Sequence, residues 1–265
     1  MRLRVVRADP AGNITLFVLD PVERAARPRV AELLMKREEF AAEQVGFACT
    51  AREGFDGRME MAAGEFCGNA SRAYGMLLAR QRGVTGKARF TLEVSGADRP
   101  VGVDVDVAAG AARASMPLPE SAEQLALPAA AGVLVDLGGI VHFVTRRAPD
   151  EAVLGELEKA LDARRAAGKF ARMEAYGVIF LHEGRMTPLV KVPAAHSLFW
   201  EGSCGSGSLA AAVAESLGTA DGAFARDYVQ PAGTVRAEVT WKRGAAAAAY
   251  VGGSVALGET VEIEL

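Results

Sequence analysis

The sequence has little cysteine: three residues among 265, none of them in a CxxC pair. Three is an odd number and too few for the disulfide framework of a small secreted domain, so free thiols are expected. The three histidines show no ligand spacing with the cysteines, which argues against a metal site. The chain contains neither a GxxxxGKS/T phosphate loop nor a dinucleotide fingerprint, and no cofactor is therefore expected.

The chain also lacks a strong charge of one sign and long apolar runs. Its formal net charge of −3 offers no attraction to phosphate backbones or anionic lipids, so neither nucleic acid nor a membrane is an expected partner. No apolar run reaches the roughly 20 residues that a membrane-spanning helix needs. The basic N-terminal segment lacks the apolar stretch and cleavage site of a secretory signal, and we therefore expect a cytoplasmic protein.

What remains is the composition of an ordinary folded protein, with 50% hydrophobic and 24% charged residues. The predicted elements occur in the same order twice: strands, a long helix, more strands, and a cysteine directly before a second helix. The long helices are expected at 28–43 and 150–168, where apolar residues recur every three or four positions. This repeated order indicates two similar α+β units, with a ligand site in a cleft between them.

Two of the cysteines stand in matching frames. Residues 65–72 read EFCGNASR and residues 201–208 read EGSCGSGS, so in both a glycine and a helix-prone stretch follow the cysteine. The first N–H groups of a helix are unpaired and carry partial positive charge, which lowers the pKa of a thiol and holds a carboxylate. Gly68 and Gly205 let a ligand approach the backbone closely. Cys49 has no such frame, and core packing is expected for it.

Two thiols that flank one ligand, Cys67 and Cys204, suit the inversion of an α-carbon. One thiolate would remove the α-proton of an amino acid from one face, and the opposed thiol would deliver a proton to the other face. The pair must titrate together, because one cysteine is charged while the other is neutral. The helix N-termini, aimed at the α-carboxylate, would stabilise the developing carbanion.

The sequence also resembles a known family. FCGNASR and SCGSGS are similar to the two cysteine signatures of diaminopimelate epimerase and its relatives, which are cofactor-independent amino-acid racemases. PAGNIT at 10–15, EQVGF at 43–47 and DLGGIVHFV at 136–144 are similar to further motifs of the family, in the same order along the chain. The resemblance covers nearly the whole chain and implies an isomerase that acts on a small amino acid without a cofactor.

The resemblance implies an α+β fold of two pseudo-symmetric domains, each a curved, mostly antiparallel sheet wrapped around a central helix. We expect one domain to comprise residues 1–121 and 253–265 and to carry the first cysteine of the pair. The other domain is expected to comprise residues 122–252 and to carry the second, with the active site in the cleft between them. Members of the family are often homodimers, and a homodimer is expected here.

By the same resemblance, Cys67 and Cys204 are the acid/base pair. The two residues after each cysteine would bind the α-carboxylate, Glu201 would bind the α-ammonium group, and two polar residues of the N-terminal half would complete the pocket. The expected substrate-binding residues are Asn13, Gln44, Gly68, Asn69, Glu201, Gly205 and Ser206.

The segment before the second cysteine departs from diaminopimelate epimerase. Residues 200–203, WEGS, lead directly into Cys204, without the arginine that in that enzyme helps to hold the distal end of the substrate. Two asparagines of the family are also absent, near 139–140 and near 176–177. A second ammonium–carboxylate end would therefore lack its partners, which disfavours diaminopimelate as the substrate.

The short WEGSCGSG form, with EFCGNA and EQVGF, most resembles the histidine racemases of staphylopine-type metallophore pathways, which make D-histidine for the next step. We therefore expect conversion of L-histidine to D-histidine for an opine-type metallophore. An imidazole side chain would need one polar partner and flat apolar walls. The residues considered for these roles are Glu43, Tyr176, Phe199 and Trp200.

Other interpretations of the sequence stay open. Within the class they are diaminopimelate epimerase itself and a racemase of another polar amino acid. A non-catalytic amino-acid-binding protein on the same scaffold would belong to another class. So would a thiol redox protein with a reversible Cys67–Cys204 disulfide.

Three polar residues beside these motifs are expected to be structural. Arg72, within the first cysteine helix, would favour a thiolate if it faced Cys67, but a solvated helix face is the expected position. For His142 and His196, packing in a strand or loop is expected rather than a role as a base or a ligand.

Overall fold

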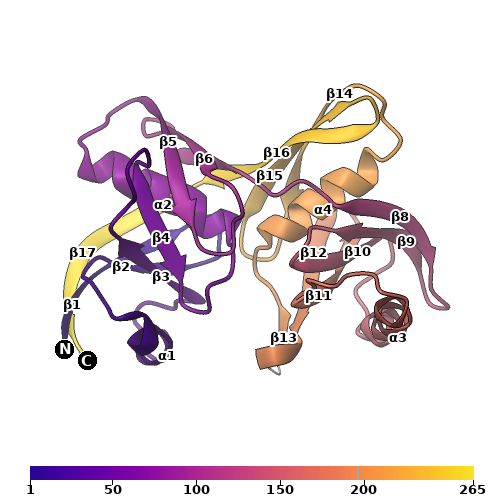
Figure 1. Cartoon of the computed structure of the whole chain (residues 1–265), viewed down its shortest axis with the longest axis horizontal. Helices are drawn as coiled ribbons and strands as arrows, with labels where there is room; N and C mark the ends of the chain where they lie inside the picture. The colour runs from indigo at the N-terminus through magenta and orange to yellow at the C-terminus, as the bar shows by residue number, and fades with distance from the viewer. Residues whose placement is uncertain (196) are drawn as a thin grey trace. The chain divides into compact units, whose positions relative to one another are not determined.

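The computed structural model describes residues 1–195 and 197–265, in which there are four α-helices (Figure 1). His196, for which packing in a strand or loop was expected, lies outside the described residues. The strands and helices follow one another in an order that is similar in both halves of the chain.

The described chain divides into two compact units. We call Met1–Met116 with Val251–Leu265 the first unit, and Pro117–Tyr250 the second unit. The sequence predicted boundaries after residues 121 and 252. The C-terminal segment thus returns to the unit in which the chain begins.

In the first unit, two helices are inserted between strands that run in parallel. Its elements are β1 (Arg2–Asp9), β2 (Thr15–Val18), η1 (Arg24–Ala26), α1 (Arg27–Met35), β3 (Gln44–Cys49), β4 (Gly57–Met61), α2 (Gly68–Gln81), β5 (Lys87–Val94), β6 (Val101–Asp106), β7 (Ala111–Ser115) and β17 (Ala256–Glu264). β2 and β3 pair in parallel on either side of α1 in the sequence, as do β4 and β5 on either side of α2. The pairs β1–β17, β1–β2, β3–β4, β5–β6 and β6–β7 are antiparallel.

The second unit is built in the same way. Its elements are β8 (Ser121–Ala126), β9 (Ala131–Asp136), β10 (Ile140–Thr145), α3 (Ala152–Ala166), β11 (Ala175–His182), β12 (Arg185–Val192), η2 (Pro193–Ala195), β13 (Ser197–Trp200), α4 (Gly205–Glu215), β14 (Gly222–Val229), β15 (Thr234–Lys242) and β16 (Ala245–Ser254), which continues into the first unit. β10 pairs in parallel with β11 around α3, and β12 with β14 around α4. The pairs β8–β9, β9–β10, β11–β12, β12–β13 and β14–β15 are antiparallel.

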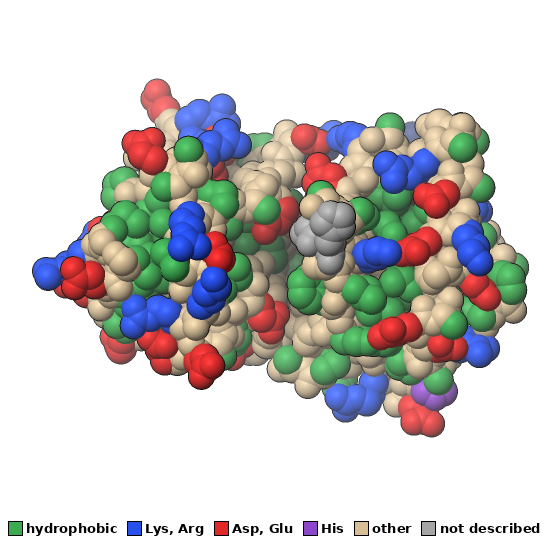
Figure 2. All heavy atoms as spheres, turned by 90° about the horizontal axis from the view of Figure 1, so that it is seen from below, with side chains coloured by type: hydrophobic (Ala, Val, Ile, Leu, Met, Phe, Trp, Pro, Cys, Tyr) green, Lys and Arg blue, Asp and Glu red, His purple; other side chains and the backbone are tan. Residues whose placement is uncertain are grey.

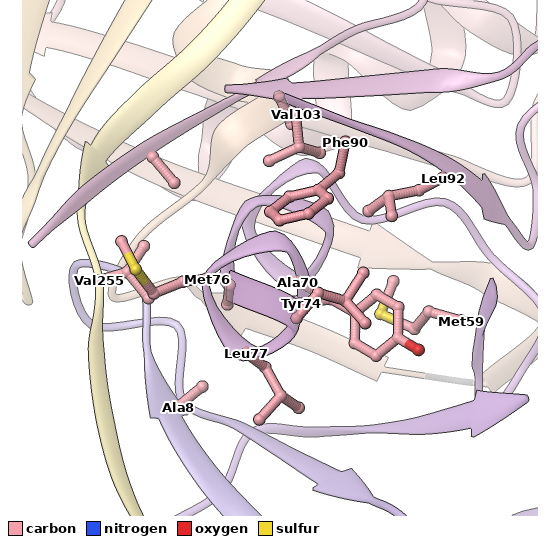
Figure 3. Packing of buried hydrophobic residues seen from close by; sticks show 14 of the residues in the cluster. Ala8, Met59, Ala70, Tyr74, Met76, Leu77, Phe90, Leu92, Val103 and Val255 are labelled. Carbon is pink, nitrogen blue, oxygen red and sulfur yellow. The ribbon is translucent and has the colours of Figure 1, made fainter. Parts of the chain in front are cut away.

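The helix after the first cysteine of the pair, α2, is buried on all sides. Every residue from Gly68 to Ala79 is buried, which follows from a sequence, GNASRAYGMLLA, that is small or apolar almost all round. Figure 3 shows Tyr74 pointing toward Met59 of β4. From another side of the helix, Leu77 points toward Ala8 of β1. The core of the first unit is therefore organised around α2.

In the second unit, α4 occupies the corresponding place. Its sequence, GSGSLAAAVAE, is rich in small residues, and 8 of its 11 residues are buried. At Gly207 a β-carbon would lie 2.5 Å from Cδ1 of Ile179 in β11, so this glycine lets the sheet approach the helix. The other helix, α3, packs through an apolar stripe on a separate cluster of the same unit, as its periodicity predicted. The predicted fold class, with two α+β units and mostly antiparallel sheets around central helices, is confirmed.

The prediction of a helix over 28–43 is wrong at its C-terminal end. α1 ends at Met35, and the chain then turns before β3. Ala41 has φ +47°, in the left-handed region, where an α-helix cannot continue. Phe40 nevertheless packs in the same apolar cluster as the buried residues of α1, so the periodicity reported burial but not helix length.

Among the helices of the described residues, none is long and apolar enough to cross a bilayer. Figure 2 shows basic and acidic side chains interspersed over one face, with hydrophobic side chains scattered between them.

Gly75 and Gly155 lie inside helices but have different surroundings. Replacement by alanine should therefore change the free energy of unfolding in opposite directions at the two positions. At Gly75 of α2 a β-carbon would lie 2.5 Å from Cγ1 of Val103. Gly75→Ala is therefore expected to lower the free energy of unfolding by about 1–3 kcal/mol through overpacking. At Gly155 of α3 the described residues leave open space, and Gly155→Ala should raise it by about 0.5–1 kcal/mol. Urea unfolding followed by circular dichroism measures both variants, and equal midpoints would contradict the close packing of α2.

Candidate functional site

Cys67 and Cys204 each occupy the N-cap of the central helix of their unit. The backbone is extended at both, with φ −134° and ψ 112° at Cys67 and φ −122° and ψ 112° at Cys204. Sγ of Cys67 accepts a hydrogen bond from Ala70 N at 3.4 Å. Sγ of Cys204 accepts one from Gly207 N at 3.2 Å. Both thiols therefore take the place of a capping side chain at the unpaired N–H groups of a helix, and the predicted helices after the two cysteines are confirmed.

A serine four residues after each cysteine completes the matching frames. The Ser71 hydroxyl donates to the Cys67 carbonyl at 2.7 Å, and the Ser208 hydroxyl donates to the Cys204 carbonyl at the same distance. Both serines are fully buried. Sequence reasoning gave them no role, although the shared serine in CGNAS and CGSGS was the signal that would have found them.

The structure gathers several predicted residues around Cys67. We call Asn13, Thr15, Gln44, Cys67 and Asn69 the first half-site. The Gln44 amide nitrogen donates to Asn13 Oδ1 and to Thr15 Oγ1, both at 2.8 Å, and lies 3.4 Å from Cys67 Sγ. The contact between Gln44 and Thr15 follows from the parallel pairing of β2 and β3, which places Thr15 opposite Gln44. Thr15 was missed from the sequence, where its only signal was a polar residue at the start of an apolar strand.

Burial, more than the helix, sets the ionisation of the first thiol. Burial raises the pKa of Cys67, and the negative charge of Glu65 adds to this rise. The N–H group of Ala70 and the side-chain amide of Gln44 act in the opposite direction and lower the pKa. The prediction that a helix N-terminus gives this thiol a pKa below its usual value is therefore wrong in net direction, because desolvation outweighs the hydrogen bonds.

Two further candidate residues, Glu43 and Gly68, lie beside the first half-site. Glu43 is hydrogen-bonded to it, and Gly68 is closely packed. The Asn13 side-chain nitrogen donates to Glu43 Oε2 at 3.0 Å, which joins Glu43 to the half-site, and burial raises the pKa of Glu43. At Gly68 a β-carbon would lie 2.5 Å from Sδ of Met116, so packing within the first unit leaves little room for a side chain there.

A second group of polar residues surrounds Cys204. We call His142, Glu201, Cys204, Ser206 and Gln230 the second half-site. Gln230 accepts from the backbone N–H of Cys204 at 2.7 Å and was not found from the sequence, because it only follows a strand. Ser206 Oγ lies 3.5 Å from Cys204 Sγ and 2.9 Å from His142 Nε2. His142 is fully buried, as the packing prediction implied, yet its ring also contacts a residue of the half-site.

A hydrogen bond with a carboxylate, Glu201, distinguishes the second thiol from the first. Burial raises the pKa of Cys204 well above its usual value, and both the charge of Glu201 and its hydrogen bond with the thiol raise it further. The Ser206 hydroxyl and the N–H of Gly207 lower it again, to a smaller extent. The neutral thiol is therefore the strongly favoured form of Cys204 in this state.

Three of the proposed specificity residues do not gather around a cysteine. Tyr176 packs in the α3 cluster, and its hydroxyl donates to Glu158 at 2.8 Å. The Trp200 ring nitrogen donates to Glu151, the residue before α3, at 3.0 Å. Phe199, on the same strand β13, is 55% exposed. Among the hydrogen bonds described for the four candidates, that of Glu43 with Asn13 is the one that reaches a half-site.

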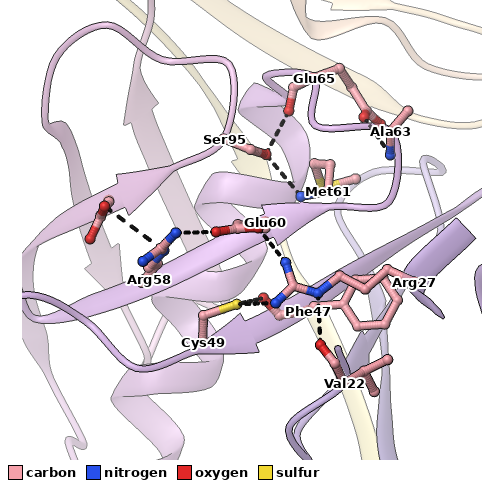
Figure 4. Close-up of polar contacts among 11 residues, drawn as sticks. Val22, Arg27, Phe47, Cys49, Arg58, Glu60, Met61, Ala63, Glu65 and Ser95 are labelled. Atoms are coloured by element: carbon pink, nitrogen blue, oxygen red, sulfur yellow. Dashed lines mark hydrogen bonds and ion pairs between the residues drawn. The ribbon is translucent and has the colours of Figure 1, made fainter. Parts of the chain in front are cut away.

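Cys49 belongs to neither half-site. Its Sγ lies 3.4 Å from Nη2 of Arg27, which also forms an ion pair with Glu60 and stacks on Phe47 (Figure 4). Cys49 packs against the apolar cluster beneath α1, and burial raises its pKa. The expected packing role of Cys49 is confirmed.

The expectation of a solvated position for Arg72 is wrong. Arg72 is fully buried, because α2 has no solvent-exposed face along the stretch that carries it. Its guanidinium donates to Asn69 Oδ1 at 3.2 Å, within the first half-site.

Solved structures of epimerases and racemases, a class of isomerases, share the fold of this chain. A hydroxyproline epimerase from Agrobacterium vitis, solved with bound trans-4-hydroxy-L-proline, has the same fold with a TM-score of 0.67. The two are 12% identical, and the similarity covers 99% of this chain and 92% of the other. At that identity the likeness concerns the fold alone.

The sequence comparisons define the family within that class. A family model described as the histidine racemase CntK N-terminal domain matches residues 2–260. A histidine racemase from Fusobacterium nucleatum is 31% identical over 217 residues, which cover 78% of each chain. One from Staphylococcus aureus is 26% identical over 246 residues, covering 89% of this chain and 87% of the other. The chain belongs to the histidine racemase family and is an isomerase, which confirms the predicted resemblance.

The His142 imidazole is expected to remain neutral between pH 5 and pH 8. Burial lowers the pKa of His142 to about 3, so its ring resonances should not shift between pH 5 and pH 8. Two-dimensional NMR of the histidine rings in isotope-labelled protein measures this, with added imidazole as the titrating control. A His142 resonance that titrates together with the imidazole would contradict the buried position.

Proposed function

We propose that the protein interconverts L-histidine and D-histidine by a two-base reaction in which Cys67 and Cys204 act on opposite faces of the α-carbon. The observation that carries this proposal is the identical placement of the two thiols. Each caps the N-terminus of the central helix of its unit, in contact with the N–H of the third residue after it.

In the proposed reaction, the thiolate of one cysteine takes the α-proton and leaves a carbanion conjugated with the substrate carboxylate. The thiol of the other cysteine gives its own proton to the opposite face of the carbon. One thiol and one thiolate are regenerated with their roles exchanged, so the protons balance and no electron is lost or gained. Reversal of the two protonation states runs the reaction in the other direction.

The helix N-termini are proposed to hold the α-carboxylate. Backbone N–H groups at Gly68 and Asn69, and at Gly205 and Ser206, belong to the first turns of α2 and α4, where the N–H groups have no partner within the helix. As the carbanion forms, charge accumulates on the carboxylate oxygens, and these donors stabilise it.

Side chains of the half-sites are proposed to bind the rest of the amino-acid group. Glu201 already interacts with the Cys204 thiol, and a carboxylate in that position can accept from the α-ammonium group. Asn13 and Gln44 are proposed to complete the pocket from the side of Cys67, which both of them contact.

For the imidazole group of the substrate, we propose Glu43 as the polar partner and Phe199 as an apolar wall. Glu43 is tied to Asn13, whereas Tyr176 and Trp200 are hydrogen-bonded to Glu158 and to the residue before α3. Family membership and the 31% identity with a histidine racemase support histidine over diaminopimelate as the substrate.

We also propose a cytoplasmic homodimer that has no nucleic-acid or membrane partner and supplies D-histidine to the synthesis of an opine-type metallophore. All three cysteines are free, which suits a reducing compartment. The mixed surface charge in Figure 2 suits a small-molecule substrate better than a polyanion.

Deuterium uptake at the α-carbon tests the proposed reaction. In heavy water the enzyme should exchange the α-proton of L-histidine and D-histidine, and should leave diaminopimelate unchanged. Exchange with diaminopimelate but not histidine would identify the enzyme as an epimerase of that substrate. No exchange with any amino acid in a panel would favour a binding or redox protein.

Replacement of either thiol should abolish racemisation. Cys67→Ser and Cys204→Ser are expected to lower the rate of inversion, followed by polarimetry or chiral chromatography, by at least about a thousandfold, since both proton transfers need a thiol. Cys49→Ser is the matched control and should retain activity, because Cys49 lies outside both half-sites. Full activity in either of the first two variants, with folding intact by circular dichroism, would exclude the two-base reaction.

A further inference from the structure

Arg72 is the largest of the fully buried side chains in the described part of the chain. It lies in α2, five residues and therefore about one and a half helical turns after Cys67. An arginine is rarely buried without an acidic partner, since the desolvation of its charge is costly. Its position therefore calls for a reason.

The hydrogen-bond acceptors that hold Arg72 are neutral. Nη1 donates to the Ser254 carbonyl at 2.8 Å, and Nη2 donates to the Pro10 carbonyl at 2.7 Å. Nε donates to Asn69 Oδ1 at 3.2 Å. Burial lowers the pKa of Arg72 to about 10, which still leaves the guanidinium charged near pH 7. A positive charge is thus fixed inside the first unit by carbonyl and amide oxygens.

Arg72 joins α2 to the loop that carries Asn13. The loop between β1 and β2 contains two successive residues with positive φ, Ala11 at +59° and Gly12 at +94°. Such a backbone is strained at alanine and needs contacts that hold it. The bond from Arg72 to the Pro10 carbonyl is one of these, so Arg72 helps to place Asn13 near Cys67.

Arg72 also orients the Asn69 side chain. A guanidinium can only donate hydrogen bonds, so the amide atom that faces it must be the oxygen. The amide nitrogen of Asn69 is therefore left to donate in another direction. The backbone N–H of Asn69 meanwhile contacts the Cys67 thiol and lowers its pKa. Arg72 thus orients Asn69, which lies two positions after Cys67 and contacts the thiol through its backbone N–H.

The second unit has no counterpart of this arginine. The residue five positions after Cys204 is Leu209, which is fully buried in α4. A carboxylate, Glu201, interacts with the thiol instead. The two cysteines therefore share a backbone frame, but a buried guanidinium lies only in the helix after Cys67, and only Cys204 is hydrogen-bonded to a carboxylate among the contacts described.

We infer that Arg72 is a positioning residue that makes Cys67 the first of the two thiols to ionise and that fixes Asn69 and the Asn13 loop beside it. The inference concerns the same site as the proposed function and rests on it. Acidic groups also face the first half-site: Glu65 near the thiol, Glu43 through Asn13, and Asp9 near Arg72. Arg72 offsets their effect. The free enzyme accordingly reacts through a Cys67 thiolate and a Cys204 thiol.

The pH dependence of thiol alkylation tests this inference. Iodoacetamide labelling of the whole enzyme, followed by peptide mass spectrometry, gives a rate for each cysteine at each pH. The apparent pKa from each profile does not depend on how accessible the thiol is, which matters because Cys204 is the more buried of the two. In the unmodified enzyme the profile of Cys67 should lie at lower pH than that of Cys204.

Variants of Arg72 separate its charge from its contacts. Arg72→Met should move the Cys67 profile upward by about one unit or more, so that its alkylation rate at pH 7.5 falls about tenfold, with little change at Cys204. Arg72→Lys keeps the charge, so the Cys67 alkylation profile should lie close to that of the unmodified enzyme. KM for histidine should be raised in both Arg72 variants, because Asn69 loses its hydrogen bond with the guanidinium. Arg80→Met is the matched control: Arg80 lies on the same helix and donates to the Gly258 carbonyl at 2.6 Å, but it is exposed.

Each outcome decides for or against the inference. It is overturned if Cys204 ionises before Cys67 in the unmodified enzyme, or if folded Arg72→Met leaves the Cys67 profile unchanged. If Arg72→Met does not fold, the inference is decided by two other observations. These are the order of the Cys67 and Cys204 alkylation profiles in the unmodified enzyme and the position of the two profiles in Arg72→Lys. Because labelling needs no substrate, a normal profile order without amino-acid exchange would refute the proposed function and leave this inference standing.

Discussion

The first turn of a buried helix presents N–H groups that have no partner within the helix and little access to water, and the structure depends on how these groups are satisfied. In α2 and α4 a cysteine sulfur accepts a hydrogen bond from one of these N–H groups, and a buried serine hydroxyl donates a hydrogen bond to the cysteine carbonyl. The sheet surrounds α2 on several sides, so the thiol is positioned by a packed core rather than by a surface loop. Such placement is what a proton transfer between fixed groups requires.

Similar frames with different neighbours give the two thiols different tendencies to ionise. Cys67 lies in the unit that buries a guanidinium, among amide groups that can donate to a thiolate. Cys204 interacts with a carboxylate and with a serine whose hydroxyl contacts a neutral, buried histidine. A two-base reaction needs one charged and one neutral sulfur at the start, and unequal surroundings supply that difference without a cofactor in the proposed scheme.

Local patterns were enough to predict much of the fold and the position of both cysteines. The CG frames predicted the N-termini of α2 and α4, and the apolar spacing of α3 predicted its buried face. The roles of Gln230 and Thr15 were not predicted, because their contacts arise from segments brought together only by the fold. The burial of Arg72 was not predicted for a related reason. An arginine on a helix is usually exposed, and two of the acceptors of Arg72, Pro10 and Ser254, are distant in the sequence. The pKa of Cys67 depended on desolvation, which no local pattern reports.

The most direct measurement is one-sided exchange by enzymes that keep a single thiol. In the proposed reaction, Cys67→Ser in heavy water retains a base on one face of the α-carbon and Cys204→Ser retains a base on the other. Each variant should therefore introduce deuterium into only one enantiomer of histidine, without inversion, and the two variants should select opposite enantiomers. If both variants exchanged the same enantiomer, or if either exchanged both, the two sulfurs would not lie on opposite faces of one carbon.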